Sequence, residues 1–217
     1  MKAYHGTNLS NWQEIKKKGI LPRKVSGKSN WVDTVESAED RVYLTTTYPL
    51  YFALQSCAED ESTAVIIEVE TDNLPGSLVA DEDALEQYFR HHSPFYNDDK
   101  MHQRTRQMAK KARLLVEYGL GFNWSMSTLG TGAHVGAIPL ECISRVALID
   151  VKKELALCFQ CSDAMITLMN YQLLGGFYKR VVSSIFGEPP PKLSPFESTM
   201  VPPSIGSGVS ILTRNDW

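Results

Sequence analysis

The sequence has no long hydrophobic run. A helix that spans a membrane needs about 18 or more consecutive apolar residues, and no stretch of the 217-residue chain approaches that length. The segment Met1–His5 also lacks the apolar stretch of a secretion signal. These absences exclude a membrane partner from our expectations and lead us to expect a cytoplasmic protein.

Cysteine is scarce as well. The chain has 4 cysteines, too few for a disulfide scaffold in a protein of this length. Cys158 and Cys161 form a C-x-x-C pair, but no second pair completes the four ligands of a structural zinc site. We therefore expect buried structural thiols in a reducing compartment, and no bound metal.

Positive charge is not in excess. The 22 Lys and Arg residues against 25 Asp and Glu residues give a formal net charge of -3. This balance excludes a protein that coats nucleic acid through its overall charge, but it leaves open a nucleic-acid substrate held by a local basic patch. The 43% hydrophobic and 22% charged residues are typical of a globular protein that can form a core.

The amino-terminal half is predicted to alternate strands with helices. Helices are expected from Ser10, where Ser10 and Gln13 form a capping box, to Gly19, and again from Pro49 onward. The polar segment 22–40 predicts a loop near a site. β-Branched and aromatic residues predict strands at 2–5, 41–46 and 63–70.

In the middle of the chain, a brief extended piece leads to a helix from about Asp83, and a longer helix is expected over residues 98–118. Strands are predicted over residues 133–151, interrupted at Pro139, and over residues 154–161.

The composition changes beyond Ser162. A helix is predicted to about Leu174, where two glycines break it before it resumes, and one late strand is predicted in GVSILT. We therefore expect a domain over residues 1–161 and a helical, Pro- and Ser-rich extension over residues 162–217 that packs on it.

A tripeptide at the first strand end has the features of a binding site. His5 at such a place is commonly a packed residue. Gly6, however, would let a ligand approach the backbone closely, and Thr7 presents a hydroxyl at a helix entrance, where an anionic group is stabilised.

These residues carry a resemblance to a known superfamily. The stretch YHGTNLSNWQEIKKKGILP, followed about twenty residues later by VYLTTTYPLYFA, resembles the ADP-ribosyltransferases, which include poly(ADP-ribose) polymerase-like enzymes and the related RNA 2′-phosphotransferases. GTGAHVGAIPLECISRVALID resembles the strand that closes these domains. The resemblance spans residues 2–150 and implies an α+β fold, a split two-sheet sandwich with peripheral helices and NAD in the cleft between the sheets.

The resemblance also implies roles for individual residues. His5 would contact the adenosine ribose, the backbone of Gly6 would clamp the carboxamide of nicotinamide, and Thr7 would contact the ribose. Tyr43 would form the pocket wall. Further cofactor contacts are expected from Thr45, Tyr51 and Phe52.

One expected residue type is missing. Many members of the superfamily place a glutamate before the closing strand, where it bonds a ribose hydroxyl. The aligned segment here has no acid and contains Leu129, Gly130, Thr131 and His134. We expect His134 to substitute for it and to act with His5 and Tyr43 in catalysis. Glu68 and Glu70 on the third strand are expected to be solvent-facing or structural.

The helix predicted over residues 98–118 is rich in Lys and Arg. Such a run is commonly a solvated face, but arginine forks also bind phosphates well. The candidate nucleic-acid contacts are Arg104, Arg106 and Lys110.

The first functional hypothesis is an NAD-dependent mono-ADP-ribosyltransferase that uses NAD as co-substrate and modifies a macromolecule, with nucleic acid slightly favoured over protein. Small transferases of this kind act as bacterial or phage toxins and effectors, which implies an antitoxin or partner protein. The alternatives are a catalytically inactive fold-mate that binds a nucleotide or protein, and an RNA 2′-phosphotransferase. For the latter, VYLTT lacks the flanking histidines that the family has.

Overall fold

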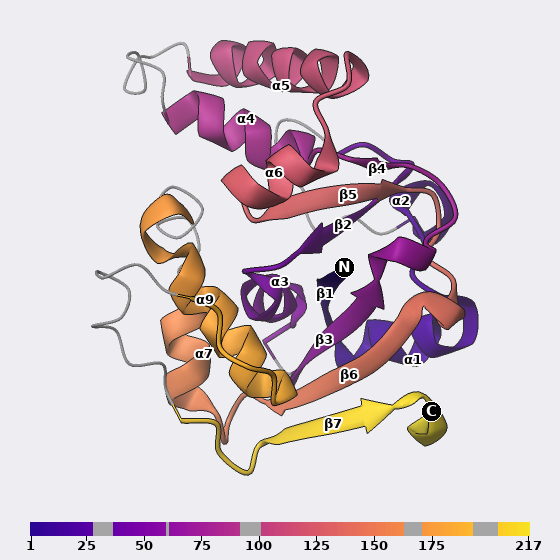
Figure 1. Cartoon of the computed structure of the whole chain (residues 1–217), viewed down its shortest axis with the longest axis vertical. Helices are drawn as coiled ribbons and strands as arrows, with labels where there is room; N and C mark the ends of the chain where they lie inside the picture. Colours follow the sequence, from indigo (N-terminus) through magenta and orange to yellow (C-terminus); the bar gives the residue numbers. More distant parts are fainter. Residues whose placement is uncertain (28–36, 60, 92–100, 163–170, 193–203) are drawn as a thin grey trace.

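The computed structural model describes residues 1–27, 37–59, 61–91, 101–162, 171–192 and 204–217. In these ranges the strands form one antiparallel sheet in the order β4-β5-β2-β1-β3-β6-β7 (Figure 1). The strands are β1 (Lys2–Asn8), β2 (Arg41–Thr45), β3 (Thr63–Glu70), β4 (Leu78–Val79), β5 (Thr131–Val135), β6 (Ile143–Asp150) and β7 (Val209–Thr213).

Helices cover both sides of the sheet. They are α1 (Leu9–Lys18), α2 (Arg23–Ser26), α3 (Pro49–Ser56), α4 (Glu82–His91), α5 (Met101–Glu117), α6 (Phe122–Thr128), α7 (Leu155–Ser162) and α9 (Tyr171–Phe186). Short 3-10 turns span Thr71–Asn73, Leu140–Cys142 and Arg214–Asp216. None of the helices in the described ranges has both the length and the apolar character needed to cross a membrane.

The two faces of the sheet pack into separate hydrophobic clusters. Val65 and Ile67 of β3 face α1 and pack with Trp12, whereas Ile66 between them faces α3, α7 and α9. This alternation follows from the two-residue period of a strand. A third cluster joins α4 to α5 and includes Leu85 and Ala112.

The centre of the sheet is weakly joined. β1 pairs with β3 along its whole length from Lys2 to Asn8, but with β2 it shares a single registered pair, Tyr4 with Thr45. We call this junction the β1–β2 seam. The expected α+β class is confirmed; in place of two separate sheets, the structure has one continuous sheet that is nearly divided at this seam.

The first helix begins earlier than predicted. The side chain of Asn8 caps α1 by accepting a hydrogen bond from the backbone N–H of Asn11 at 2.8 Å. The predicted capping box at Ser10 is therefore wrong, because Asn8 already satisfies a free backbone donor of the first turn. Gly19 ends the helix as predicted, with a φ of 78° that favours glycine.

The strand predicted over residues 154–161 is wrong. This segment forms α7, and its buried residues Leu157, Cys158 and Cys161 recur at helical spacing against the sheet. A short apolar run does not by itself distinguish a strand from a buried helix.

The predicted break at Gly175 and Gly176 is also wrong, since α9 continues through both glycines to Phe186. Burial of Phe177, Val181 and other residues of α9 in the core offsets the cost of about 1 kcal/mol that each glycine imposes on a helix. The extension is integrated with the rest of the chain, because β7 also pairs with β6 at the sheet edge.

A buried ion-pair network ties β3 and β6 to the end of α9. Glu68 is 1% exposed, and the Arg145 guanidinium donates to both of its oxygens, at 3.0 Å from Nε and 2.5 Å from Nη2. Arg145 Nη2 also donates to Glu188 at 2.6 Å. The Ser144 hydroxyl donates to Glu68 at 2.5 Å, and Lys2 Nζ lies 3.4 Å from it. Glu68 was expected to be either solvent-facing or structural, and its burial in this network shows that it is structural.

Candidate functional site

A cavity of about 500 Å³ opens at the β1–β2 seam. Its volume lies in the range of small-molecule sites. The lining comes from β1 and β2, from α1 and α2 on one side, from α3 on another and from the start of α4. The cavity therefore forms where the ladder between β1 and β2 stops after one registered pair.

His5 lies in the cavity lining and bridges the seam. Its Nδ1 is 3.0 Å from the carbonyl oxygen of Tyr43. Since a carbonyl only accepts, this nitrogen carries the proton, and Nε2 of the neutral ring is left as an acceptor. Burial lowers the pKa of His5 and outweighs the opposite effect of the Tyr43 hydrogen bond. The ring is therefore neutral at pH 7.

Gly6 lines the cavity, but its lack of a side chain has a packing reason. A Cβ placed on Gly6 would lie 2.2 Å from the carbonyl oxygen of Pro49 and 2.6 Å from the backbone nitrogen of Ala53. Both atoms belong to α3, which therefore sits directly against β1. The glycine would be needed in any protein with this packing, whether or not it binds a ligand.

The two expected threonines differ in how much of their hydroxyl groups remains free. The Thr45 hydroxyl donates to Gly130 O at 2.7 Å and accepts the N–H groups of Thr47 and Tyr48 at 3.0 Å each. These bonds join the end of β2 to the start of α3. A hydroxyl has one donor and two acceptor positions, so the Thr45 hydroxyl has none left for a cofactor. Thr7 is 3% exposed and lines the cavity.

Tyr43 also lines the cavity, and its hydroxyl is held by the start of α4. It donates to Glu82 Oε1 at 2.5 Å and accepts the backbone N–H of Ala38 at 3.1 Å. Glu82 is 2% exposed and also accepts from Arg41 Nη1 at 2.5 Å. Burial, followed by the nearby acidic groups, raises the pKa of Tyr43 well above its ordinary value. The hydroxyl thus stays protonated and fixes the ring in the cavity wall.

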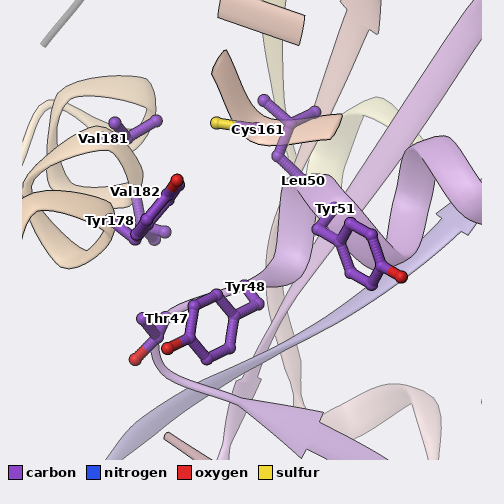
Figure 2. A pocket seen from close by; sticks show the side chains of 8 residues that line it. All are labelled: Thr47, Tyr48, Leu50, Tyr51, Cys161, Tyr178, Val181 and Val182. Carbon is purple, nitrogen blue, oxygen red and sulfur yellow. The ribbon is translucent and has the colours of Figure 1, made fainter. Parts of the chain in front are cut away.

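The two aromatic residues predicted on α3 are brought to the same cavity. Tyr51 and Phe52 both line it, with ring centroids 5.3 Å apart and planes inclined at 66°. Tyr51 also borders a second, much smaller cavity of about 10 Å³ between α3 and α9 (Figure 2). In Figure 2 the Tyr51 hydroxyl points away from Tyr178 and Val181. The small cavity holds at most a single water, so it is no ligand site.

Two acidic residues that the sequence did not predict as site residues, Asp81 and Asp83, belong to the cavity wall. Burial raises the pKa of Asp81 to about 8, with further contributions from the charges of Asp83 and Glu82. Burial and the charge of Glu82 raise the pKa of Asp83 to about 6. Their signal in the sequence is the acid-rich ADEDAL, which by itself indicates only the start of a helix.

His134 is not brought to the cavity. It is fully buried in β5, with Nε2 2.9 Å from Pro75 O and Nδ1 3.2 Å from Gly136 O. Both ring nitrogens thus lie against backbone carbonyl groups, and His134 is absent from the cavity lining in the described residues. Its contacts are those of a packed, structural histidine.

The candidate nucleic-acid contacts lie on α5, which packs on α4 away from the sheet (Figure 1). Arg106 and Lys110 are exposed, whereas the side chain of Arg104 lies outside the described part of the chain. Lys111 on the same helix lies over the ring of Phe89, 4.6 Å from its centroid. Part of the basic run therefore serves packing, whereas Arg106 and Lys110 face solvent.

The cysteines of the C-x-x-C pair are buried in the cluster beneath α7 and α9. Burial raises the pKa of Cys158 to about 11 and that of Cys161 to about 12. Both are therefore thiols rather than thiolates at neutral pH, as expected of structural cysteines.

Comparison with known proteins does not assign a family. No protein-family model matches the chain, and no curated protein matches it. A solved structure named EcPltA superposes with a TM-score of 0.36 and 12% sequence identity, covering 68% of this chain and 75% of EcPltA. A likeness at this level assigns neither fold family nor function.

Proposed function

We propose that the chain is an NAD-dependent mono-ADP-ribosyltransferase. The observation that carries the proposal is the composition of one cavity. His5, Gly6 and Thr7 of β1, Tyr43 of β2, and the aromatic pair of α3 come from three separate elements and line the same 500 Å³ space. These are the residues that the resemblance selects for holding NAD.

The geometry suits the ends of a dinucleotide. Nε2 of His5 can accept a hydrogen bond from a ribose hydroxyl, because Nδ1 carries the proton that is donated to Tyr43 O. Tyr51 and Phe52 lie in the cavity lining, where an aromatic ring could stack on the nicotinamide, and each stacked pair contributes about 0.5–1.5 kcal/mol beyond burial. Beyond Tyr4, the described part of β2 leaves the neighbouring edge of β1 without registered partners, so backbone groups there can bind a carboxamide.

The chemistry explains why such a site would accelerate the reaction. When the bond between nicotinamide and ribose breaks, its electron pair leaves with the nicotinamide and positive charge develops on the sugar. An enzyme gains rate by fixing the leaving amide and stabilising that charge. The acceptor is a macromolecule, with nucleic acid ahead of protein because Arg106 and Lys110 are exposed, and we retain the toxin or effector role as part of the proposal.

The proposal is tested by incubating the purified protein with NAD carrying a label on its adenosine and a cell lysate. We expect free nicotinamide and a labelled adduct. Parallel digestion with nuclease and with protease identifies the acceptor class. If neither nicotinamide nor adduct forms with mixed RNA, DNA and protein, the proposal is wrong.

The two histidines give a sharper test. His5→Phe keeps an aromatic ring at this position but removes both nitrogens, so kcat/KM for NAD should fall about tenfold, the value of one lost hydrogen bond of roughly 1.4 kcal/mol. The fold should survive with a modest loss of stability. His134→Phe is the matched comparison: it removes the buried ring nitrogens that lie against Pro75 O and Gly136 O, and should lower the melting temperature without lowering kcat/KM. A fall of kcat/KM in His134→Phe alone would return the catalytic role to His134.

A second candidate is a fold-mate that binds NAD without cleaving it. It is favoured by one observation: Gly6 is required by the packing of α3, so its presence does not depend on catalysis. Calorimetry that detects NAD binding, together with no nicotinamide formed over hours, would select this candidate.

A further inference from the structure

The start of β5 is the place where the resemblance predicts a glutamate and where the chain has Thr131. The structure brings a carboxyl group to this place from elsewhere. Asp81 precedes α4, fifty positions earlier in the sequence, yet its side chain interacts with the Thr131 hydroxyl and both residues line the cavity. The spatial neighbourhood of the start of β5 therefore contains an acid that the linear sequence does not show.

Asp81 has a structural task that leaves part of its carboxyl group free. It caps α4: its Oδ1 accepts the backbone N–H groups of Asp83 at 3.0 Å and Ala84 at 2.9 Å. Both bonds fall on the same oxygen, so capping does not occupy Oδ2. The backbone of Asp81 is held by Ser125 Oγ at 3.1 Å and by Leu85 N at 3.0 Å. The carboxyl group is thus fixed in place before any ligand binds.

The hydroxyl of the neighbouring Thr131 also points to a ligand. Thr131 is 1% exposed, and no group in the described ranges completes a hydrogen bond of normal geometry with its Oγ1. The carboxyl group of Asp81, which is 5% exposed, is near enough to interact with this hydroxyl. Buried hydroxyls nearly always have a partner. A ribose hydroxyl placed between the two side chains would supply one.

We propose that Asp81 is the catalytic carboxylate of the NAD-cleaving site, accepting a ribose hydroxyl beside Thr131 and stabilising the positive charge that develops on the sugar. This rests on the proposed function. The C1′–N1 bond breaks and its electron pair leaves on neutral nicotinamide. The acceptor forms the new bond to C1′, and its proton passes to the Asp81 carboxylate and then to solvent.

Other groups also act on this carboxyl group, and they determine how its pH dependence is interpreted. Burial raises the pKa of Asp81, so the ionised, active form increases with pH up to about 8. Asp83 titrates close by, because burial and the charge of Glu82 raise its pKa to about 6 and outweigh the opposing effects of Ser37 and Arg113. Three other elements also bring groups to Asp81. Glu82 lies on α4 and is paired with Arg41, Thr131 lies on β5, and Ser125 lies on α6.

The test is Asp81→Asn. Asparagine caps a helix as well as aspartate does, so the variant should fold while losing the charge. We expect kcat/KM for NAD to fall about 100-fold, as when one group aimed at transition-state charge is removed. The rise of wild-type kcat/KM between pH 6 and 8 should be lost or confined to the part that Asp83 causes. Calorimetry should show NAD affinity changed by less than threefold.

A stability readout separates catalysis from misfolding. The pKa of Asp81 is higher in the folded protein than in the unfolded chain. The fold therefore loses stability as the pH rises from the unfolded pKa of Asp81 toward 8. Asp81→Asn should therefore melt at a higher temperature than wild type at pH 9, although it is less active. Asp150→Asn is the control, because Asp150 Oδ1 also accepts two backbone N–H groups, from Lys152 and Lys153, and lies outside the cavity lining. It should keep full activity and the wild-type pH profile.

The possible outcomes are distinct. A wild-type protein that forms no nicotinamide removes the proposed function and this inference with it. A wild-type protein that cleaves NAD while Asp81→Asn keeps its rate and pH profile overturns the inference alone. A 100-fold loss with a melting temperature at pH 6 no lower than that of wild type, and with NAD affinity changed by less than threefold, supports it.

Discussion

Replacing Gly6 with alanine is expected to lower the free energy of unfolding by at least about 3 kcal/mol, the upper end of the usual cost of overpacking. The new Cβ would lie 2.2 Å from Pro49 O and 2.6 Å from Ala53 N. Both are backbone atoms of α3, which cannot rotate away as a side chain can. Relief therefore requires α3 to move off β1, and α3 also packs in the cluster that contains Leu50 and Ile66. Urea unfolding followed by circular dichroism measures the loss.

Gly121→Ala is the matched control. Gly121 has a φ of -82°, and a Cβ there would meet nothing within 4 Å. Its substitution should cost less than about 1 kcal/mol, the loss of a favourable residue at a helix amino terminus. If Gly6→Ala were as mild as Gly121→Ala, the close approach of α3 to β1 would be wrong. The result also bears on function, because a Gly6 variant that loses activity through unfolding says nothing about carboxamide binding.

Replacing Arg145 with methionine should cost about 3 kcal/mol. The guanidinium donates to both Glu68 oxygens, to Glu188 and to Phe186 O. Removing it leaves Glu68, 1% exposed, as a poorly compensated buried charge, and such losses run to about 3–5 kcal/mol. The lower end applies here because Lys2 Nζ remains 3.4 Å from Glu68. Denaturant unfolding at pH 7 measures the effect.

The effect should depend on pH. Burial alone would raise the pKa of Glu68, but the hydrogen bonds from Arg145 and Ser144 and the charges of Arg145 and Lys2 together lower it below 4.5. A carboxyl group with a lowered pKa stabilises the fold above its unfolded pKa, and this contribution is lost as the pH falls through the folded value. The difference between wild type and Arg145→Met should thus be full at pH 7 and shrink below pH 4.5.

Lys153→Met is the control for Arg145→Met. Its Nζ lies 3.5 Å from Asp150 Oδ2, and the lysine side chain is 65% exposed. Exposed pairs of this kind are worth about 0–1 kcal/mol. Equal losses in the two variants would mean that the Glu68 network does not stabilise the fold in the way its burial indicates.

Local patterns in the sequence were enough to locate most elements. The strands at the amino terminus, the start of α3 at Pro49 and the late strand β7 are found where the sequence predicts them. The errors occurred where tertiary packing outweighs local preference. The C-x-x-C segment forms a helix because one side of it is buried, and α9 continues through two glycines because its other residues pack in the core.

The candidate site was only half predictable for a similar reason. His5, Gly6 and Thr7 are adjacent in the sequence, so one motif identifies them. Asp81 and Thr131 are far apart along the chain and become neighbours only when α4 and β5 come together. No local pattern carries that information, and a search for an acid near His134 could not find one that a different element supplies.

The β1–β2 seam also bears on how a substrate would enter. The two halves of the sheet share one registered pair, whereas β1 and β3 share seven. A small rotation of one half against the other therefore breaks few backbone hydrogen bonds, while the same rotation at β1 and β3 would break a whole ladder. The seam is thus the place where the sheet could bend at the lowest cost in backbone hydrogen bonds, and the amide protons of β2 that face β1 should exchange with solvent faster than those of β3.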